Sequence, residues 1–182
     1  MGAALENLSD INRDTFWDVD GMSAEELDRS FQVTDEKMTI IYKFVLGYND
    51  YINRRHNYAS DVDLTMLEAH LLTMICDQEN CTVTDLATAW NRSISATSQT
   101  VRQLIKKELV LRENSLENGR IFYLRPTQKG KELSDTHKRY DVLDTIKTIK
   151  RLLKVLSMKD VEKLFTALDC YNAILHDGSQ SR

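Results

Sequence analysis

The sequence predicts a mainly helical protein with one small β-hairpin, and three observations carry this prediction. The chain contains only one proline and six glycines, so few residues interrupt helices. Apolar side chains recur at three- and four-residue spacing in several long segments, which is the pattern of amphipathic helices. An Asn-Gly pair at residues 118–119 lies between two β-rich runs, as in a tight hairpin.

We expect a cytoplasmic protein that performs no chemical catalysis. No apolar run approaches the ~18 residues that cross a bilayer, and the N-terminus lacks the basic-then-apolar pattern of a secretory signal. The cysteines Cys76, Cys81 and Cys170 form no Cys-x-x-Cys pair and fit a reducing compartment. The sequence contains no Gly-rich phosphate loop, no G-x-S-x-G and no H-E-x-x-H motif.

Charge is distributed unevenly along the chain, although the formal net charge is only −4. Residues 1–36 carry ten acidic and two basic side chains, a balance of −8, whereas residues 92–154 carry 15 basic and seven acidic ones, a balance of +8. Non-specific affinity for DNA depends on local positive charge opposite phosphates. The net negative charge is therefore weak evidence against a nucleic-acid partner.

The N-terminal third of the chain predicts an arm followed by two helices. Residues 1–20 are polar and acidic and should form a loosely docked arm. Ser23 and Glu26 have the spacing of a capping box, which predicts a short helix over residues 24–31. A long amphipathic helix should run from about residue 35 to 55. Its apolar stripe contains Ile40, Ile41, Phe44, Val45, Tyr48, Tyr51 and Ile52.

A polar loop is expected over residues 57–63, before a second capping box at Thr65 and Glu68. That box opens a helix that should reach about Cys76 and end in the polar run 77–80. The inner face of this helix should contain Leu67, Leu71, Met74 and Ile75.

Residues 82–107 are typical of two short helices joined by a tight turn. Residues 82–83 should form a short strand before a helix over residues 85–90. Asn91 tolerates the left-handed conformation that such a turn often needs. Ser93 is then the natural N-cap of the second helix, which should end near residue 107.

This second helix separates into two faces at 100° per residue. The apolar face contains Ile94, Thr97, Val101, Leu104 and Ile105. The opposite face contains Ser95, Gln99, Arg102, Gln103 and Lys106, with Ser98 at the border. Arg can bridge guanine O6 and N7, Gln can pair with adenine, and Ser can reach bases or phosphates. A merely solvated face is the alternative, but the capped helix, turn and hairpin around it favour groove reading.

The hairpin should pair residues 110–114 with residues 121–125. Arg112 lies near its base, and Arg120 follows Asn118 just past the turn. An Arg at such a tip could enter a minor groove, where narrow A·T-rich stretches concentrate negative potential. The alternative is an exposed Arg that only aids solubility.

Two amphipathic helices should complete the chain. The first should run from Thr127 to about Leu156, and a third capping box at Ser157 and Asp160 should open the last helix, which reaches about Leu175. Both carry apolar stripes with no globular core nearby in sequence. These stripes should pack against helix 35–55 or against a second subunit.

Residues 35–175 resemble the MarR (multiple-antibiotic-resistance regulator) family of winged helix–turn–helix transcription factors. The matching segments are Leu64-Thr65, Asp85-Leu-Ala87, Ser93, Leu104, Leu109-Val110 and Thr127-x-Lys-Gly130. The resemblance implies a homodimer whose terminal helices interlock and whose two winged domains reach successive major grooves of a pseudo-palindromic operator.

Three features depart from the family pattern. The wing reads Asn118-Gly119-Arg120, whereas the family usually has Asp-x-Arg with a further Arg between. Glu108 stands where a Gly usually ends the recognition helix. The acidic residues 1–33 have no counterpart in the family's usual short N-terminus.

The sequence thus predicts an acidic extension over residues 1–33, a dimerisation region over residues 34–60 and 128–176, and a winged helix–turn–helix domain over residues 61–127. The resemblance implies a DNA-binding regulator, most often a repressor, that is released when a ligand fixes a domain spacing unsuited to two grooves. The predicted DNA contacts are Ser93, Ser95, Ser98, Gln99, Arg102, Gln103, Lys106, Arg112, Asn118 and Arg120.

A cleft for a small aromatic effector, which the resemblance implies, would be lined by Phe44, Tyr48, Tyr51, His70 and Met74. Plain core packing is the alternative for these side chains. No metal or cofactor is expected, because the Cys, His and acidic residues lack the spacing of zinc ligands. A thiol-based redox sensor and a winged-helix protein-interaction module remain open as alternatives.

Overall fold

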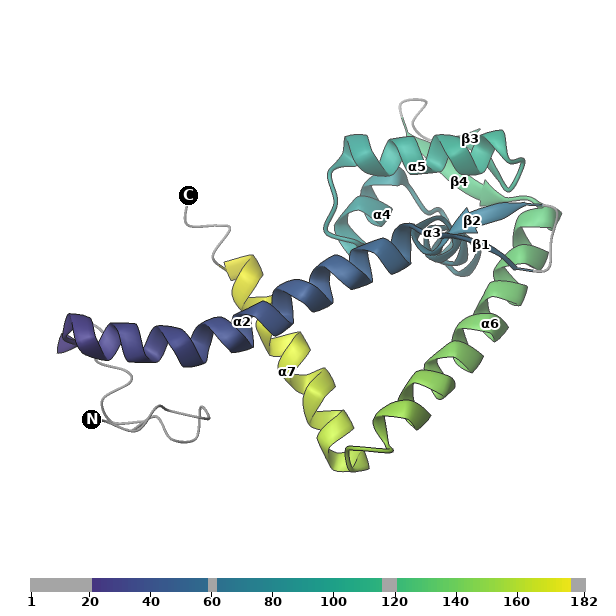
Figure 1. Cartoon of the computed structure of the whole chain (residues 1–182). Coiled ribbons are helices and arrows are strands. Elements are labelled where there is room, and N and C mark those ends of the chain that lie inside the picture. The colour runs from purple at the N-terminus through teal and green to yellow at the C-terminus, as the bar shows by residue number, and fades with distance from the viewer. Residues whose placement is uncertain (1–20, 59–61, 116–120, 178–182) are drawn as a thin grey trace. The chain divides into compact units, whose positions relative to one another are not determined.

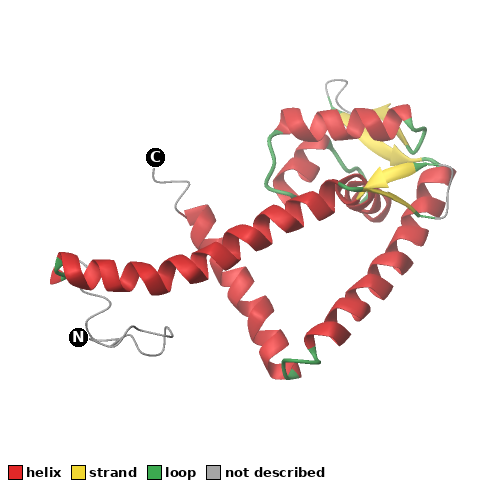
Figure 2. Ribbon diagram, viewed as in Figure 1, coloured by secondary structure: helices red, strands yellow, loops and turns green. Residues whose placement is uncertain are grey.

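The computed structural model describes residues 21–58, 62–115 and 121–177. The chain divides into two compact units, Met1–Arg54 and Arg55–Arg182. Within these described ranges helices dominate both units, and four short strands form two separate two-stranded sheets (Figure 2). The predicted mainly helical fold with a hairpin is therefore confirmed. No described helix combines the length and apolar character needed to cross a bilayer.

In the described part of the first unit, residues 21–54, one continuous helix, α2 (Ala24–Asn53), replaces the two helices that the sequence predicted (Figure 1). The Ser23 capping box is confirmed, because the Ser23 hydroxyl accepts a hydrogen bond from the Glu26 amide at 3.3 Å. The predicted break near residue 33 is wrong. Residues 32–34 include no proline or glycine, and the Thr34 hydroxyl donates to the Ser30 carbonyl at 2.8 Å within the helix.

The second unit begins with an antiparallel pair of strands, β1 (Arg55–Asn57) and β2 (Asp63–Thr65), in which His56 faces Leu64. The sequence predicted a polar loop over residues 57–63, so both strands were missed. Three-residue strands are too short to display an alternating pattern.

Helix α3 (Met66–Asp77) forms the centre of the second unit's core. The Thr65–Glu68 capping box is confirmed. Of the predicted inner face, Leu71 and Ile75 are fully buried, Leu67 and Met74 are half-buried, and the unpredicted Leu72 is fully buried. Helix α3 is therefore buried around more of its circumference than a one-sided amphipathic pattern predicts.

Helix α6 (Gln128–Leu152) packs on α3, and the Ser134 hydroxyl donates to the Thr73 hydroxyl at 3.1 Å. Its first turn requires a glycine, because a Cβ at Gly130 would lie 2.2 Å from the Leu109 carbonyl oxygen. The helix ends four residues before the predicted Leu156.

Helix α4 (Val83–Ala89) begins directly at Thr82, whose side chain accepts from the Asp85 amide at 3.2 Å. The predicted strand at residues 82–83 is therefore wrong, because the capping box favours helix from Val83 onward. The preceding Cys81 carbonyl nevertheless accepts from the Leu124 amide at 2.8 Å, which ties the chain to the hairpin.

Helix α7 (Met158–Asp177) follows the predicted capping box, in which the Ser157 hydroxyl accepts from the Asp160 amide at 3.2 Å. Large apolar side chains of α6 and α7 remain exposed to solvent in the single chain. They include Val142, Leu143, Ile146, Leu164, Phe165, Leu168, Tyr171, Ile174 and Leu175, and Val155 between the two helices is exposed as well.

Candidate nucleic-acid interface

The turn between α4 and α5 (Ile94–Lys106) is built as the sequence predicted. Asn91 takes a left-handed conformation with φ of 45°, and the Arg92 amide donates back to the Ala87 carbonyl at 2.9 Å. The Ser93 hydroxyl then accepts from the Ala96 amide at 3.2 Å and caps α5. The tight turn fixes the direction in which α5 leaves α4.

Helix α5 buries one face and exposes the other. Thr97, Val101 and Leu104 are buried, and Ile105 is half-buried. Ile94 is 57% exposed, so its predicted place in the packing face is wrong, because the first turn of α5 projects beyond the core. The predicted polar face is exposed at Ser95, Gln99, Arg102, Gln103 and Lys106, and Ser98 is half-buried at its border.

The C-terminal end of α5 is held by backbone and ionic contacts. Glu108 takes the left-handed conformation with φ of 61°, and the Leu109 amide donates to the Leu104 carbonyl at 3.0 Å, as in a Schellman motif. Lys107 binds the Glu68 carboxylate of α3 at 2.7 Å. The helix is thereby anchored to the core without the glycine that usually occupies this position.

The hairpin pairs β3 (Val110–Asn114) with β4 (Phe122–Pro126), with Arg112 opposite Leu124. The Arg112 guanidinium lies 4.4 Å from the centre of the Phe122 ring, as a cation–π contact. The predicted contacts Asn118 and Arg120 lie outside the described residues.

A second arginine braces the hairpin. Arg125 binds the Glu113 carboxylate at 2.7 Å and the Asn80 side-chain oxygen at 2.7 Å. Asn80 follows α3 and takes a left-handed conformation with φ of 56°. The wing is therefore attached to the end of α3 as well as to Cys81.

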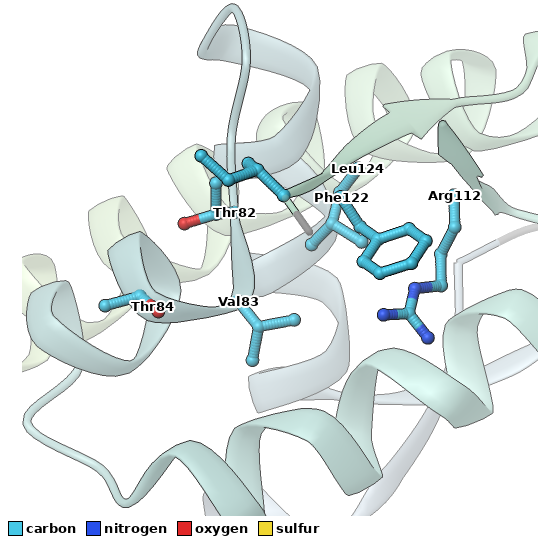
Figure 3. Close-up of a pocket in the computed structure, with 7 residues that line it drawn as sticks. Thr82, Val83, Thr84, Arg112, Phe122 and Leu124 are labelled. Carbon is cyan, nitrogen blue, oxygen red and sulfur yellow. The ribbon is translucent and has the colours of Figure 1, made fainter. Parts of the chain in front are cut away.

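A hollow lies between the wing and the start of α4, with the Arg112 guanidinium beside the Phe122 ring (Figure 3). This cavity of about 380 Å³ is lined by Thr82, Val83, Thr84, Arg112, Ile121, Phe122 and Leu124. A smaller cavity of about 140 Å³ shares Val83 and Arg112 with it and reaches Ser98 and Arg102 of α5. The predicted contacts Ser98, Arg102 and Arg112 therefore line one cavity.

A cluster of possible metal ligands was missed by the sequence analysis. His70 of α3, His137 and Asp141 of α6 bring one ligand atom each within 4.8 Å of one another. Sequence spacing could not reveal this cluster because α3 and α6 are far apart along the chain. The only available signal was the i, i+4 spacing of His137 and Asp141 on one helix face.

His137 is the most constrained member of this cluster. It is 2% exposed, and neither ring nitrogen has a hydrogen-bond partner among the described residues. Burial, together with the neighbouring His70, lowers the pKa of His137 to about 4. The ring is therefore neutral at pH 7 and retains a free lone pair, which a metal ion requires.

Comparison with known proteins identifies the family. The MarR family profile matches residues 64–122. The transcriptional regulator AdcR of Streptococcus pyogenes serotype M6 (strain ATCC BAA-946 / MGAS10394) is 31% identical over 103 residues, which are 57% of this chain and 69% of AdcR. The chain belongs to the MarR family. It is a DNA-binding transcriptional regulator and not an enzyme.

Solved structures of MarR-type proteins share the fold. The crystal structure of the S. pyogenes adhesin competence repressor AdcR covers 78% of this chain and 96% of its own, at 24% identity and a TM-score of 0.57. The structure of Streptococcus pneumoniae FabT in complex with DNA matches 81% of this chain and 98% of the FabT chain, at 20% identity and a TM-score of 0.57. The zinc-responsive MarR family member ZitR of Lactococcus lactis matches 79% of this chain and 99% of the ZitR chain, at 15% identity and a TM-score of 0.59.

The predicted aromatic cleft falls on two separate units of this MarR-family chain. Phe44, Tyr48 and Tyr51 follow one another along α2, with ring centres 5.6 Å and 5.9 Å apart. His70 and Met74 lie on α3, where Met74 packs against the core. The cleft stays a prediction.

Cys76 and Cys81 give no support to a redox sensor. Cys81 is fully buried, and burial raises the pKa of its thiol to about 11. Burial also raises the pKa of Cys76, whose sulfur lies 3.9 Å from the Gly130 carbonyl oxygen. Both groups are thiols rather than reactive thiolates at neutral pH.

Proposed function

We propose that this chain is a homodimeric repressor that binds a pseudo-palindromic operator through α5 and the wing. The observation that carries the proposal is the exposed polar face of α5, anchored at both ends and placed beside a braced wing. The proposed DNA contacts are Ser93, Ser95, Ser98, Gln99, Arg102, Gln103, Lys106, Arg112, Asn118 and Arg120.

Each class of contact has a distinct role. Arg102 and Gln99 reach base edges in the major groove, where Arg suits guanine and Gln suits adenine. Ser93 and Lys106 flank this face and contact phosphates, which fix the position of the protein on the duplex. Arg112 and Arg120 of the wing add positive charge near a neighbouring stretch of backbone or minor groove.

A homodimer explains the apolar faces that the single chain leaves in contact with water. Phe165, Leu168 and Leu175 of α7 are 54%, 42% and 60% exposed. MarR-family regulators act on their operators as dimers, and a contiguous apolar stripe of this length favours burial against a second copy. We propose residues 34–60 and 128–176 as the dimerisation region and residues 61–127 as the DNA-binding domain.

The test is a binding titration on a duplex obtained by selecting bound sequences from a random pool. Arg102→Ala should weaken binding about 5- to 150-fold, the loss of one bidentate base contact, and should relax one base position. Lys159→Ala, an exposed lysine at the start of α7, is the matched control and should leave affinity unchanged. Equal affinity of Arg102→Ala and wild type would refute the assignment.

A divalent transition metal is the effector that the geometry favours. Imidazole nitrogen and carboxylate oxygen are zinc ligands, and the partnerless, neutral His137 has a lone pair available. AdcR is described as zinc-dependent and ZitR as zinc-responsive, which supports the same class of ion for this chain. A bound ion would supply a coordination link between α3 and α6, held by His70, His137 and Asp141.

Zinc affinity, measured by competition with a chromophoric chelator, tests the metal assignment directly. Asp141→Asn should weaken binding at least ~10-fold, as loss of a charged ligand does. Asp144→Asn, one turn further along α6, should leave the zinc affinity unchanged. If both variants bind zinc like the wild type, the cluster is not the site.

The small aromatic effector remains the second proposal for release from DNA. Its support is the row of neighbouring rings on α2, in which Phe44 stacks on Tyr48 and Tyr48 is tilted against Tyr51. A simple phenol that weakens operator binding of the metal-free protein, but not of Tyr48→Ala, would support it.

A further inference from the structure

Trp90 occupies a position between the possible metal ligands and the recognition helix. It is the C-cap of α4, and its amide donates to the Leu86 carbonyl at 3.1 Å. Its indole lies 5.3 Å from the His70 ring, centre to centre, at an interplanar angle of 38°. The residue therefore contacts α3 through its side chain while its backbone forms the start of the helix–turn–helix turn.

Two aromatic rings contact His70. The His137 ring of α6 lies 4.8 Å away in an edge-on arrangement, and the Trp90 ring lies 5.3 Å away. A displacement of His70 toward α6 must therefore change its contact with Trp90. Trp90 is 38% exposed, so the direct contact between the two rings, and not a packed interior around them, would carry such a displacement.

Coordination requires a displacement of this kind. The ligand atoms of His70, His137 and Asp141 are separated by up to 4.8 Å. Two ligands of a tetrahedral zinc ion lie about 3.4 Å apart, given bond lengths of about 2.0–2.1 Å. His137 and Asp141 share α6, so drawing the three ligands around one ion would also bring His70 of α3 closer to α6.

The backbone that joins Trp90 to α5 is short and held by hydrogen bonds. Asn91 is fixed in the left-handed conformation, and the Arg92 amide is bonded to the Ala87 carbonyl at 2.9 Å. Ser93 follows at once as the N-cap of α5. A change at the indole therefore reaches the first turn of the recognition helix through a short, hydrogen-bonded segment.

We infer that Trp90 is a positioning residue that couples metal occupancy of the His70 cluster to the placement of α5 on DNA. This inference rests on the proposed metal effector and adds to it the route by which the signal travels. The indole packs against His70 in the metal-free protein and loses or alters that contact when His70 approaches α6.

The coupling is measured as the ratio of operator affinities with zinc and with a chelator. In the wild type this ratio should differ from one by about 5- to 150-fold, the usual range of allosteric coupling. Trp90→Leu should reduce it to within about twofold of one, while zinc affinity and metal-free operator affinity stay within about threefold of wild type. Trp90→Phe, which keeps a ring beside His70, should retain most of the coupling.

A purely structural role of Trp90 would instead weaken metal-free operator binding and leave the ratio unchanged. Wild-type coupling in Trp90→Leu would overturn the relay and leave the metal site standing. Failure of the wild type to bind zinc would overturn both, while operator binding would still support the DNA-binding assignment.

A spectroscopic measurement does not depend on the folding of a Trp90 variant. The chain has two tryptophans, so a Trp17→Phe background leaves Trp90 as its sole indole. Zinc should change the emission of Trp90 with the same midpoint as metal binding, and Asp141→Asn should shift that midpoint. Emission that does not respond to bound zinc would overturn the inference.

Discussion

Replacement of Glu108 by glycine should stabilise the protein by about 0.5–1 kcal/mol. Glu108 has φ of 61°, a left-handed conformation that costs a residue with a Cβ about 1–2 kcal/mol. Glycine removes this cost. Its greater conformational freedom in the unfolded chain, however, lowers the free energy of unfolding by about 0.4–1 kcal/mol. The difference between the two effects favours the glycine variant.

The contacts that hold this position are made by the backbone, so the substitution preserves them. The Glu108 amide donates to the Ile105 carbonyl at 2.9 Å, and its carbonyl accepts from the Thr127 hydroxyl at 2.8 Å. The Glu108 side chain itself is exposed. Glu108→Ala is the matched control, because it removes the side chain and keeps the strained Cβ.

Urea unfolding at one protein concentration, with a chelator present, measures the effect. Concentration must be fixed because dimerisation contributes to apparent stability. The glycine variant should unfold at a higher urea midpoint with an unchanged m-value, and its Tm should rise by about 1–4 °C. The alanine variant should not gain stability. A glycine variant less stable than wild type, or an alanine variant equally stabilised, would refute the strain argument.

Three further perturbations have outcomes that follow from the described contacts. Gly130→Ala should destabilise the protein by about 2 kcal/mol or more in the same urea assay, because its Cβ would lie 2.2 Å from a backbone oxygen. In metal-free protein, stability should fall by up to about 3 kcal/mol as the pH drops from 6.5 to 4, because the pKa of His137 is about 4 when folded and 6.5 in the unfolded chain. His137→Phe should abolish most of this dependence, and an unchanged pH profile would contradict it. Maleimide should modify the exposed Cys170 within minutes, as peptide mapping would show. It should leave Cys81 unmodified, because Cys81 is buried and its thiol has a pKa of about 11. Rapid labelling of Cys81 would contradict this prediction.

The local features of the interface were predictable because they are encoded within a few neighbouring residues. Ser93 as an N-cap, Asn91 in the left-handed turn and the buried Val101 all follow from helix geometry and side-chain chemistry. The continuous helix α2 was missed for a related reason. A polar stretch with neither proline nor glycine was interpreted as a break, although such residues can continue a helix.

The features that escaped prediction depend on contacts between distant segments. The strands β1 and β2 exist because residues 55–57 and 63–65 pair with each other, and each is too short to be recognised alone. The cluster of His70, His137 and Asp141 forms only when α3 packs on α6. Spacing rules for metal ligands assume neighbouring positions in sequence, so they cannot detect a site assembled from two helices.

Helix α3 contacts both ends of the recognition helix, and this arrangement bears on how an effector could act. Glu68 of α3 binds Lys107 at the C-cap of α5, and His70 of α3 packs against Trp90, which precedes the α5 N-cap. A shift of α3 relative to α6 would therefore move α5 as one body rather than bend it. Because two recognition helices of a dimer must match successive grooves about 34 Å apart, a rigid displacement of each helix changes their spacing on both half-sites at once. An effector bound between α3 and α6 thus needs no contact with the DNA-reading face to alter operator affinity.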